Sequence, residues 1–415
     1  MLKGKRILCF SDFSLVGTGF GTVSRYVLST FHQAGLEINH LAINYHGDFV
    51  DRNIVPWQQQ PARLLDPKDP HGTGMFLRTV ATRDYDYIWV CNDLYVLNGI
   101  AKQYQQVVDE LIAHGKKAPI LIYYYPVDCR VKKSHAGFLD VVDVPVCYNQ
   151  YGYDETLKTF PHLKDRLQIL PHGTDTTMFH PLSEKERKEI RRDLLGIGDE
   201  TTVVIQVNRN NTRKQIPYSF LAFKKFREQV PDSIYYCHMA VIDQGGDLRD
   251  PLEHLGLTLK NDVVFPVNYS SSHPVAPEIL NNIYNAGDMF LSCHLGEGHG
   301  LTAHEAMAAG LPVILPNNTN TSELLGNNER GYIYPCRDEI YIDSSGFRKR
   351  GLIPDVVEAM MKVKNAIPEE KEEVTSKARQ WTEEHDWKLI APRWLGVLRE
   401  ATFSKKQKRS SVQEI

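Results

Sequence analysis

Two glutamates separated by seven residues stand in the stretch 296–305, which reads GEGHGLTAHE. Glu297 lies in a glycine-rich turn after an apolar run, and Glu305 lies one turn into the helix that we expect from Leu301. Backbone amides of such a turn, together with a helix N-terminus, suit a diphosphate. Carboxylates accept hydrogen bonds from vicinal hydroxyls. The stretch therefore suits a phosphorylated sugar; a tight turn with two solvated glutamates is the alternative on spacing alone.

Three cations follow another apolar run, in the stretch NRNNTRK at 208–214. Arg209 and Arg213 can grip phosphate oxygens in bidentate fashion, and Lys214 adds a point charge. At the carboxyl end of a strand, such cations would offset the charge that grows on a departing diphosphate. A basic loop in solvent is the alternative interpretation.

A third glycine-rich stretch, GTGFG at 17–21, follows the first apolar run of the chain. Glycines such as Gly19 and Gly21 allow backbone amides to come close to a phosphate. The spacing differs from GxGxxG and no Walker lysine follows, so a plain tight turn is the alternative.

The elements that must position these residues repeat along the chain. Short apolar runs, typical of strands buried on both faces, alternate with amphipathic helical stretches. In the first half the apolar runs are 5–10, 41–45, 85–93, 119–128, 144–149 and 167–173. In the second half they are 202–208, 233–241, 263–268, 289–296 and 311–317. The helical stretches are 23–35, 97–114, 183–197, 217–229, 277–287 and 301–310. This alternation predicts an α/β protein with a parallel, doubly wound sheet in each half.

The 415 residues exceed what one hydrophobic core usually serves. We expect an N-terminal Rossmann-like domain at 1–178 and a C-terminal Rossmann-like domain at 179–385. A crossover helix at 386–403 should pack on the N-terminal domain, and 404–415 should form a flexible tail.

Composition excludes several classes of protein. The net charge of −3 provides no global basic field for nucleic acid. The first apolar run is too short for a signal peptide, and no run approaches the length of a membrane span. The seven cysteines include no CxxC pair, and histidines form no HExxH, so we expect no built-in metal site. A cytoplasmic location is expected.

Four motifs in the right order make the chain resemble the large retaining glycosyltransferase family of GT-B fold known as family 4 or group 1. The family mark is Glu, seven residues, Glu, and the whole of EGHGLTAHEAMAAGLPVI at 297–314 resembles its core. LPHGTDTTMFHP at 170–181 resembles its interdomain segment, and HDWKLIAPRWLGVL at 385–398 its crossover helix. Arg209 and Lys214 match its Arg and Lys pair. The resemblance covers 165–400 well, but the N-terminal half only through GTGFG and the βα pattern.

The resemblance implies two Rossmann-like domains facing across a cleft, the domain at 1–178 binding the acceptor and the domain at 179–385 binding the nucleotide-sugar. It also implies transfer of a sugar from a nucleotide-sugar, most commonly a UDP-sugar, with retention of anomeric configuration. It implies that Glu297 contacts the hydroxyls of the donor sugar, that Glu305 holds the ribose, and that Arg209 and Lys214 stabilise the diphosphate leaving group. The donor would also be lined by the following residues: Gly19, Gly21, Gly298, His299, Gly300 and Leu301. No cofactor is built in, and a metal is not usually essential.

One position departs from the family pattern. Many members carry a His near the sugar after a strand of the N-terminal domain, where this chain reads YPVD at 125–128. Asp128 takes that place as a candidate catalytic residue, with a turn residue as the alternative. Arg130, Lys132 and Lys133 follow it and could meet phosphates of DNA or of an anionic glycan.

The sequence does not determine which acceptor receives the sugar. NRNNTRKQIPYSFLAF at 208–223 and LPNNTNTSELLG at 315–326 resemble glycosyltransferases encoded by large tailed phages, some of which glycosylate hydroxymethylated DNA bases. Such a base in double-stranded DNA is our first acceptor hypothesis, and the location would then be the host cytoplasm. A polysaccharide or cell-envelope glycan is the alternative. A GT-B sugar-nucleotide epimerase and an inactive sugar-binding module are the rival functions.

Overall fold

The computed structural model describes residues 2–66, 68–267, 269, 275–342 and 346–401. The chain forms two compact units, which we treat separately: unit 1 comprises Met1–His172 and Lys388–Ile415, and unit 2 comprises Gly173–Trp387. The first boundary thus follows residue 172 rather than 178. The proposed flexible tail at 404–415 lies outside the described residues.

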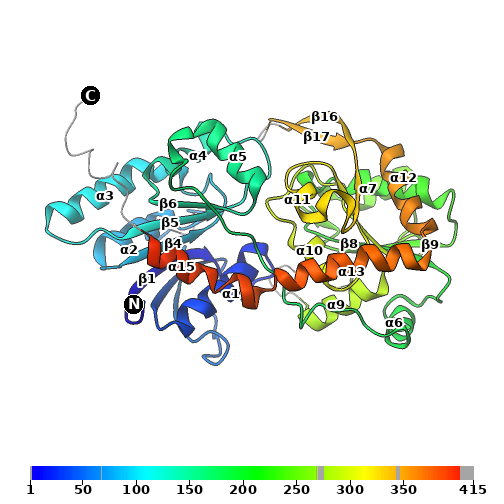
Figure 1. Ribbon diagram of the computed structural model, residues 1–415, viewed down its shortest axis with the longest axis horizontal. Helices are drawn as coiled ribbons and strands as arrows, with labels where there is room; N and C mark the ends of the chain where they lie inside the picture. The colour runs from blue at the N-terminus through cyan, green and yellow to red at the C-terminus, as the bar shows by residue number, and fades with distance from the viewer. Residues whose placement is uncertain (1, 67, 268, 270–274, 343–345, 402–415) are drawn as a thin grey trace. The chain divides into compact units, whose positions relative to one another are not determined.

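Unit 1 is built on a seven-stranded parallel sheet of order β3-β2-β1-β4-β5-β6-β7 (Figure 1). Its strands are β1 (Arg6–Asp12), β2 (Glu37–Ile43), β3 (Gln58–Pro61), β4 (Tyr87–Cys91), β5 (Ile120–Tyr125), β6 (Val144–Cys147) and β7 (Gln168–Ile169). Its helices include α1 (Gly19–Gln33), α2 (Thr73–Thr82), α3 (Ala101–Ala113), α4 (Lys133–Ala136), α5 (Gln150–Thr159) and α15 (Arg393–Glu400). The strand order reverses between β1 and β4, which is the doubly wound arrangement predicted from the alternation.

Both faces of this sheet are covered. Phe76 of α2 and Tyr104 of α3 pack in a buried cluster with β1 and β4. On the other face Phe31 of α1 meets Trp89 of β4, with ring centroids 6.0 Å apart. Trp394 of α15 packs edge-on against Trp89 at 5.8 Å. Covering both faces explains why the strands are uninterrupted apolar runs.

Unit 2 has a six-stranded parallel sheet of order β12-β9-β8-β13-β14-β15. Its strands are β8 (Thr202–Val207), β9 (Ser233–His238), β12 (Val263–Val264), β13 (Met289–Leu291), β14 (Val313–Pro316) and β15 (Tyr332–Tyr334). Two antiparallel hairpins lie outside the sheet: β10 (Ile242–Asp243) with β11 (Gly246–Asp247), and β16 (Cys336–Ile342) with β17 (Gly346–Gly351). This second sheet was also expected from the alternation.

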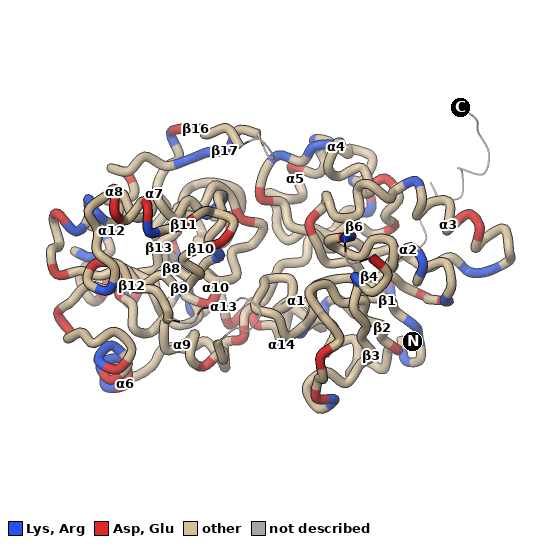
Figure 2. Tube along the Cα trace, turned by 180° about the vertical axis from the view of Figure 1, so that it is seen from behind, with Lys and Arg blue, Asp and Glu red and all other residues tan. Residues whose placement is uncertain are grey.

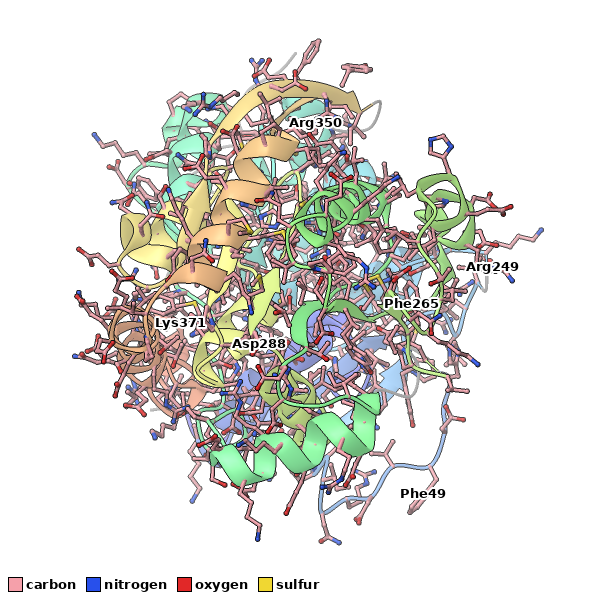
Figure 3. The ribbon with its side chains drawn as sticks, turned by 90° about the vertical axis from the view of Figure 1, so that its right-hand side faces the viewer. Phe49, Arg249, Phe265, Asp288, Arg350 and Lys371 are labelled. Atoms are coloured by element: carbon pink, nitrogen blue, oxygen red, sulfur yellow. The ribbon has the colours of Figure 1, made fainter. Side chains whose placement is uncertain are left out.

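Helices cover both faces of the second sheet. They are α6 (Glu184–Ile190), α7 (Ile216–Arg227), α8 (Arg249–Leu255), α9 (Pro277–Ala286), α10 (Leu301–Ala308), α11 (Thr321–Leu325), α12 (Ile353–Asn365) and α13 (Pro368–Glu384). One buried cluster joins the sheet to α7, α8 and α12, and another joins it to α9, α10 and α13. Buried Arg191, just beyond α6, pairs with Asp288 (labelled in Figure 3) at 3.1 Å. Asp288 also accepts from the Val203 amide of β8.

The two ends of unit 2 are joined by backbone hydrogen bonds. The Thr174 amide donates to the His385 carbonyl at 3.1 Å, and the Trp387 amide donates to the Thr174 carbonyl at 3.0 Å. A Cβ on Gly173 would lie 2.7 Å from the Trp387 nitrogen, so this crossing requires glycine. The bonded residues lie at the two ends of unit 2, which begins at Gly173 and ends at Trp387.

The proposed crossover helix at 386–403 is two short helices in the structure. Helix α14 (Trp387–Ile390) ends before Pro392, and α15 begins at Arg393. Proline lacks an amide hydrogen and disfavours a helical residue before it, which explains the break. Residues 402 and 403 lie outside the described part.

Charges are interspersed on both units (Figure 2), as the near-neutral composition indicates. Within the described residues no helix is long and apolar enough to cross a membrane. No group of three or more His, Cys, Asp or Glu side chains in that same part of the chain is arranged to hold a metal ion.

Candidate functional site

Glu297 of unit 2 lies between two cations that come from the end of β8. Lys214 donates from Nζ to Glu297 Oε1, and Arg213 Nη1 donates to Glu297 Oε2 at 2.9 Å. The side chains of Lys214 and Glu297 are only 12% and 13% exposed. This ion-paired group joins the glycine-rich stretch after β13 to the basic stretch after β8, which the sequence analysis had treated as separate motifs.

The loop after β8 holds Lys214 in place. Residues Thr212–Lys214 form a 3₁₀ turn, which the Asn211 side chain caps by accepting from the Lys214 amide at 3.2 Å. Gln215 then takes a left-handed conformation with φ 53°, and α7 begins at Ile216. The Leu295 amide donates to the Arg213 carbonyl at 2.9 Å, so the two loops are also tied through their backbones.

The Glu297 carboxyl is held ionised by its neighbours. Burial alone would raise its pKa, but the positive charges of Arg213 and Lys214 outweigh burial and keep the pKa well below its usual range. The carboxylate thus stays a hydrogen-bond acceptor at any physiological pH.

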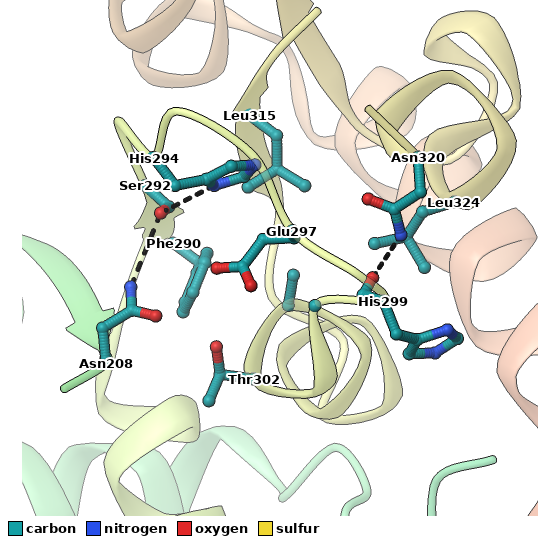
Figure 4. A pocket seen from close by; sticks show the side chains of 12 residues that line it. Asn208, Phe290, Ser292, His294, Glu297, His299, Thr302, Leu315, Asn320 and Leu324 are labelled. Carbon is teal, nitrogen blue, oxygen red and sulfur yellow. Dashed lines mark hydrogen bonds between the residues drawn. The ribbon is translucent and has the colours of Figure 1, made fainter. Parts of the chain in front are cut away.

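A small pocket beside Glu297 is lined by polar and apolar side chains, among them residues from the ends of β8 and β13 and the start of α10 (Figure 4). Ser292 Oγ contacts His294 Nδ1 at 3.0 Å, and Asn208 Nδ2 donates to Ser292 Oγ at 3.5 Å. Figure 4 shows Glu297 and Thr302 on the wall of this pocket. Ligands of parallel α/β sheets bind at these carboxyl ends of strands.

The turn into α10 presents backbone donors next to Glu297. Gly300 caps α10 in a left-handed conformation with φ 90°, and Leu301 is the first helical residue. The first amides of a helix lack intrahelical acceptors and carry partial positive charge. Gly298 and Gly300 therefore lie where backbone amides can meet an anionic ligand.

Glu305, the second glutamate, lies in α10 and faces a neighbouring helix. The buried Tyr284 hydroxyl of α9 donates to Glu305 Oε2 at 2.8 Å. A hydroxyl bond of this kind fixes the orientation of the carboxylate, and a carboxylate oxygen can accept more than one hydrogen bond.

The His299 side chain is turned inward. Its Nε2 lies 3.1 Å from Nδ1 of buried His304, and Figure 4 shows the ring directed away from the Glu297 carboxylate. Burial lowers the pKa of His299 to about 3, and burial lowers the pKa of His304 well below its usual value. His299 therefore borders the pocket as a neutral ring, with its carbonyl accepting from Asn320 Nδ2.

Arg209, which the family pattern groups with Lys214, pairs with Asp243 rather than with Glu297. Its guanidinium binds Asp243 of the β10–β11 hairpin at 3.1 Å, and its side chain is 42% exposed. The position beside Glu297 belongs to Arg213. The sequence analysis named Arg213 as a possible phosphate-binding cation but did not pair it with Glu297, because nothing in the spacing shows which cation contacts a residue more than 80 positions away.

Gly19 and Gly21 belong to unit 1 and are helical rather than part of a loop. Thr18 caps α1, which begins at Gly19, and Thr18 Oγ1 donates to Asp12 Oδ2 at 2.6 Å. A Cβ on Gly21 would lie 2.6 Å from the Val16 carbonyl oxygen. Gly21 thus serves close packing of the turn, and the first amides of α1 emerge at the carboxyl end of β1.

Asp128, also in unit 1, follows β5 at the carboxyl edge of the sheet. Asp12 ends β1 and Asp93 follows β4, so neighbouring strands bring three carboxylates to one edge. All three act on Tyr95: burial first, and then the charges of Asp93, Asp12 and Asp128, raise its pKa to about 12. Beyond Asp128 the chain exposes Arg130 and Lys133.

Comparison with known proteins identifies the region that carries the ion-paired group. Residues 186–342 match the family described as "Glycosyl transferases group 1". This part of the chain is thus similar to a group 1 glycosyltransferase domain. Alpha-monoglucosyldiacylglycerol synthase of Streptococcus pneumoniae is 25% identical over 251 residues, which is 60% of this chain and 52% of that protein. The chain spans about half the length, or less, of the first relatives that it matches.

Solved glycosyltransferase structures share the fold of the whole chain. A glycosyltransferase from Rickettsia africae superposes with a TM-score of 0.70 at 12% identity, covering 96% of this chain and 98% of that one. Anabaena Alr3699/HepE in complex with UDP-glucose superposes with a TM-score of 0.65 at 15% identity, covering 95% and 99%. The predicted GT-B fold with two Rossmann-like sheets is thereby confirmed.

Proposed function

We propose that the protein transfers a sugar from a nucleotide-sugar, with a UDP-sugar as the first candidate, to an acceptor hydroxyl with retention of configuration. The observation that carries the proposal is Glu297 paired with Lys214 at the start of α10, in a pocket at the carboxyl ends of β8 and β13. A neighbour of the same fold, Anabaena Alr3699/HepE, binds UDP-glucose, which supports this donor class.

Each candidate site residue receives a role from its chemistry. Glu297 accepts hydrogen bonds from the sugar hydroxyls, and Glu305, oriented by Tyr284, accepts from the ribose. Lys214 and Arg209 stabilise the diphosphate, and the amides from Gly298 to Leu301 bind its oxygens. Gly19 and Gly21 would add helix α1 amides to the diphosphate.

In the reaction, the bond between the sugar C1 and the diphosphate oxygen breaks, and the acceptor oxygen bonds to C1 on the same face. The proton of the acceptor hydroxyl passes to the leaving phosphate oxygen. Lys214 lowers the barrier because negative charge grows on that diphosphate as the bond breaks. Asp128 is proposed to orient the acceptor or the sugar from unit 1. No step requires a metal in this scheme.

Residues at the carboxyl edge of the unit 1 sheet suit two kinds of acceptor. Asp12, Asp93 and Asp128 suit hydroxyl groups, because carboxylates accept their hydrogen bonds. The exposed Arg130 and Lys133 suit phosphates. The first property fits a polysaccharide or envelope glycan, and the second fits a hydroxymethylated base in phage DNA, so both acceptors enter the test.

The test measures diphosphate release from a panel of nucleotide-sugars with plain DNA, hydroxymethylcytosine DNA, an envelope glycan or no acceptor. Mass spectrometry of the nucleosides and glycans follows each reaction. Release that depends on hydroxymethylated DNA, with one hexose or pentose mass added, establishes the DNA acceptor. Release that depends on the glycan establishes the alternative, and NMR of the product tests retention.

Two outcomes would contradict the proposal. Conversion of the donor into an epimer without any acceptor would establish the epimerase. Failure of every donor to bind or react would leave only an inactive module.

A further inference from the structure

Glu297, Lys214 and Arg213 cannot all keep their present partners once a donor binds. Lys214 has its ammonium on Glu297 Oε1, whereas the proposed function needs that ammonium on a diphosphate. Glu297 is 13% exposed, and a carboxylate so nearly buried needs a remaining cation when Lys214 turns away.

Arg213 is placed to be that cation. It binds the other oxygen, Glu297 Oε2, at 2.9 Å, so it does not compete with Lys214 for one atom. Its Nη1 also donates to the Gly296 carbonyl, next to Glu297 in the chain. With the Leu295 amide bound to the Arg213 carbonyl, side chain and backbone hold Arg213 on the glycine-rich turn.

The charge balance points in the same direction. Without donor, one carboxylate faces two cations, and Glu297 fills the place beside Lys214 that an anionic ligand would take. An incoming diphosphate brings more negative charge than a single carboxylate and so draws Lys214 away. Arg213 stays, since its bond to the Gly296 carbonyl does not depend on the ligand.

We propose that Arg213 is a positioning residue for sugar transfer: it holds Glu297 towards the sugar while Lys214 exchanges Glu297 for the donor diphosphate. This rests on the proposed function and adds a residue to it. Arg213 acts through Glu297, so its loss impairs use of the sugar rather than binding of the diphosphate.

The test compares the wild type with Arg213→Gln and Arg213→Lys in two assays: calorimetric affinity for UDP, which has the diphosphate but no sugar, and steady-state turnover of the preferred UDP-sugar. Arg213→Gln should reduce kcat/KM at least tenfold while its UDP affinity stays within threefold. Arg213→Lys should recover most of kcat/KM, because an ammonium can still pair with Glu297. Thermal unfolding of each variant confirms that it is folded.

The matched control is Arg249→Gln. Arg249 also pairs with a carboxylate, Asp247, at the surface, with a 58% exposed side chain (Figure 3), and its loss should leave both assays unchanged. Equal losses of UDP affinity and kcat/KM in Arg213→Gln would make Arg213 a phosphate ligand and overturn the inference. Wild-type turnover in Arg213→Gln would overturn it as well. A wild type that binds and turns over no nucleotide-sugar would overturn the proposed function, and the inference with it.

Discussion

At the residue scale, the molecule concentrates its chemistry in side chains that are both charged and nearly buried. Glu297 is ionised despite burial because two cations face it, and Glu305 is oriented by one buried phenol. Burial strengthens such interactions because water screens them less. Substitutions that change only one or two atoms of these side chains should therefore have large effects on turnover.

Glu297→Gln tests the charge with little change of shape. The amide cannot accept from Arg213 and Lys214 as a carboxylate does, and it holds sugar hydroxyls less strongly. We expect kcat/KM for the nucleotide-sugar to fall by about 100-fold or more, with circular dichroism unchanged. Turnover within threefold of wild type would show that Glu297 does not touch the donor.

Tyr284→Phe tests the orientation of Glu305. Removing the hydroxyl deletes the 2.8 Å bond to Glu305 Oε2, and a hydrogen bond to a charged group is worth about 1.5–3 kcal/mol. We expect KM for the donor to rise roughly tenfold, with kcat changed much less.

The control for this variant is Tyr235→Phe. The Tyr235 hydroxyl also makes a buried bond, to Gln206 Oε1 at 2.6 Å, but does not touch Glu305. Its loss should lower stability and leave KM unchanged. The same rise of KM in both variants would mean that Glu305 is not specifically involved.

Much of this site could be predicted from the sequence, since Glu297, Glu305 and Lys214 stand in motifs with recognisable spacing. Arg213 was expected only as a phosphate-binding cation and Tyr284 received no role, because their partners Glu297 and Glu305 lie in other segments of the chain and only the fold brings them together. His299 was expected at the donor, yet its ring packs against His304, because a turn residue's side-chain direction does not follow from spacing.

At the element scale, strands that end at one edge of each sheet place the loops. Strand β13 ends at Leu291, earlier than the apolar run to 296 predicts, because the residues after it leave the sheet and line the pocket. The amphipathic stretch 183–197 is α6 followed by a π turn over Arg191–Leu195, where buried Arg191 pairs with Asp288. Contacts between distant parts of the chain determine where these elements end, and the local sequence pattern does not contain that information.

The turn between β1 and α1 allows a test of close packing. A Cβ on Gly21 would come 2.6 Å from the Val16 carbonyl oxygen and 2.9 Å from that of Phe13, both backbone atoms. We expect Gly21→Ala to destabilise unit 1 by about 1–3 kcal/mol, seen as a lower urea midpoint. Gly99→Ala is the control, because no atom lies within 4 Å of its added Cβ. Equal midpoints for the two variants would rule out this packing role.

At the scale of the whole molecule, several buried histidines make stability depend on pH. Burial lowers the pKa of His40 and of His238 to about 4, and burial lowers that of His299 to about 3. In the unfolded chain these rings take up protons below about pH 6.5, whereas the folded protein leaves them neutral until about pH 4. Folding therefore loses stability as pH falls through that window.

Urea unfolding at pH 7.5 and at pH 5.0 measures the effect. We expect a lower midpoint at pH 5.0, with each buried histidine contributing on the order of 2 kcal/mol. Glu297 adds nothing in this range, because its lowered pKa stabilises the fold above about pH 4.5 and that stability is lost only below. His40→Gln should reduce the difference between the two pH values. Identical urea midpoints at the two pH values would contradict the burial of these histidines as neutral rings.

The central claim is that unit 2 binds a nucleoside diphosphate through Lys214 beside Glu297. Calorimetric titration of UDP, GDP and ADP into the wild type and into Lys214→Ala tests it most directly. We expect the wild type to bind one of these diphosphates, UDP first, and Lys214→Ala to bind it at least tenfold more weakly with its thermal unfolding intact. Binding of none of the three by the wild type, or equal affinity in both proteins, would contradict the claim.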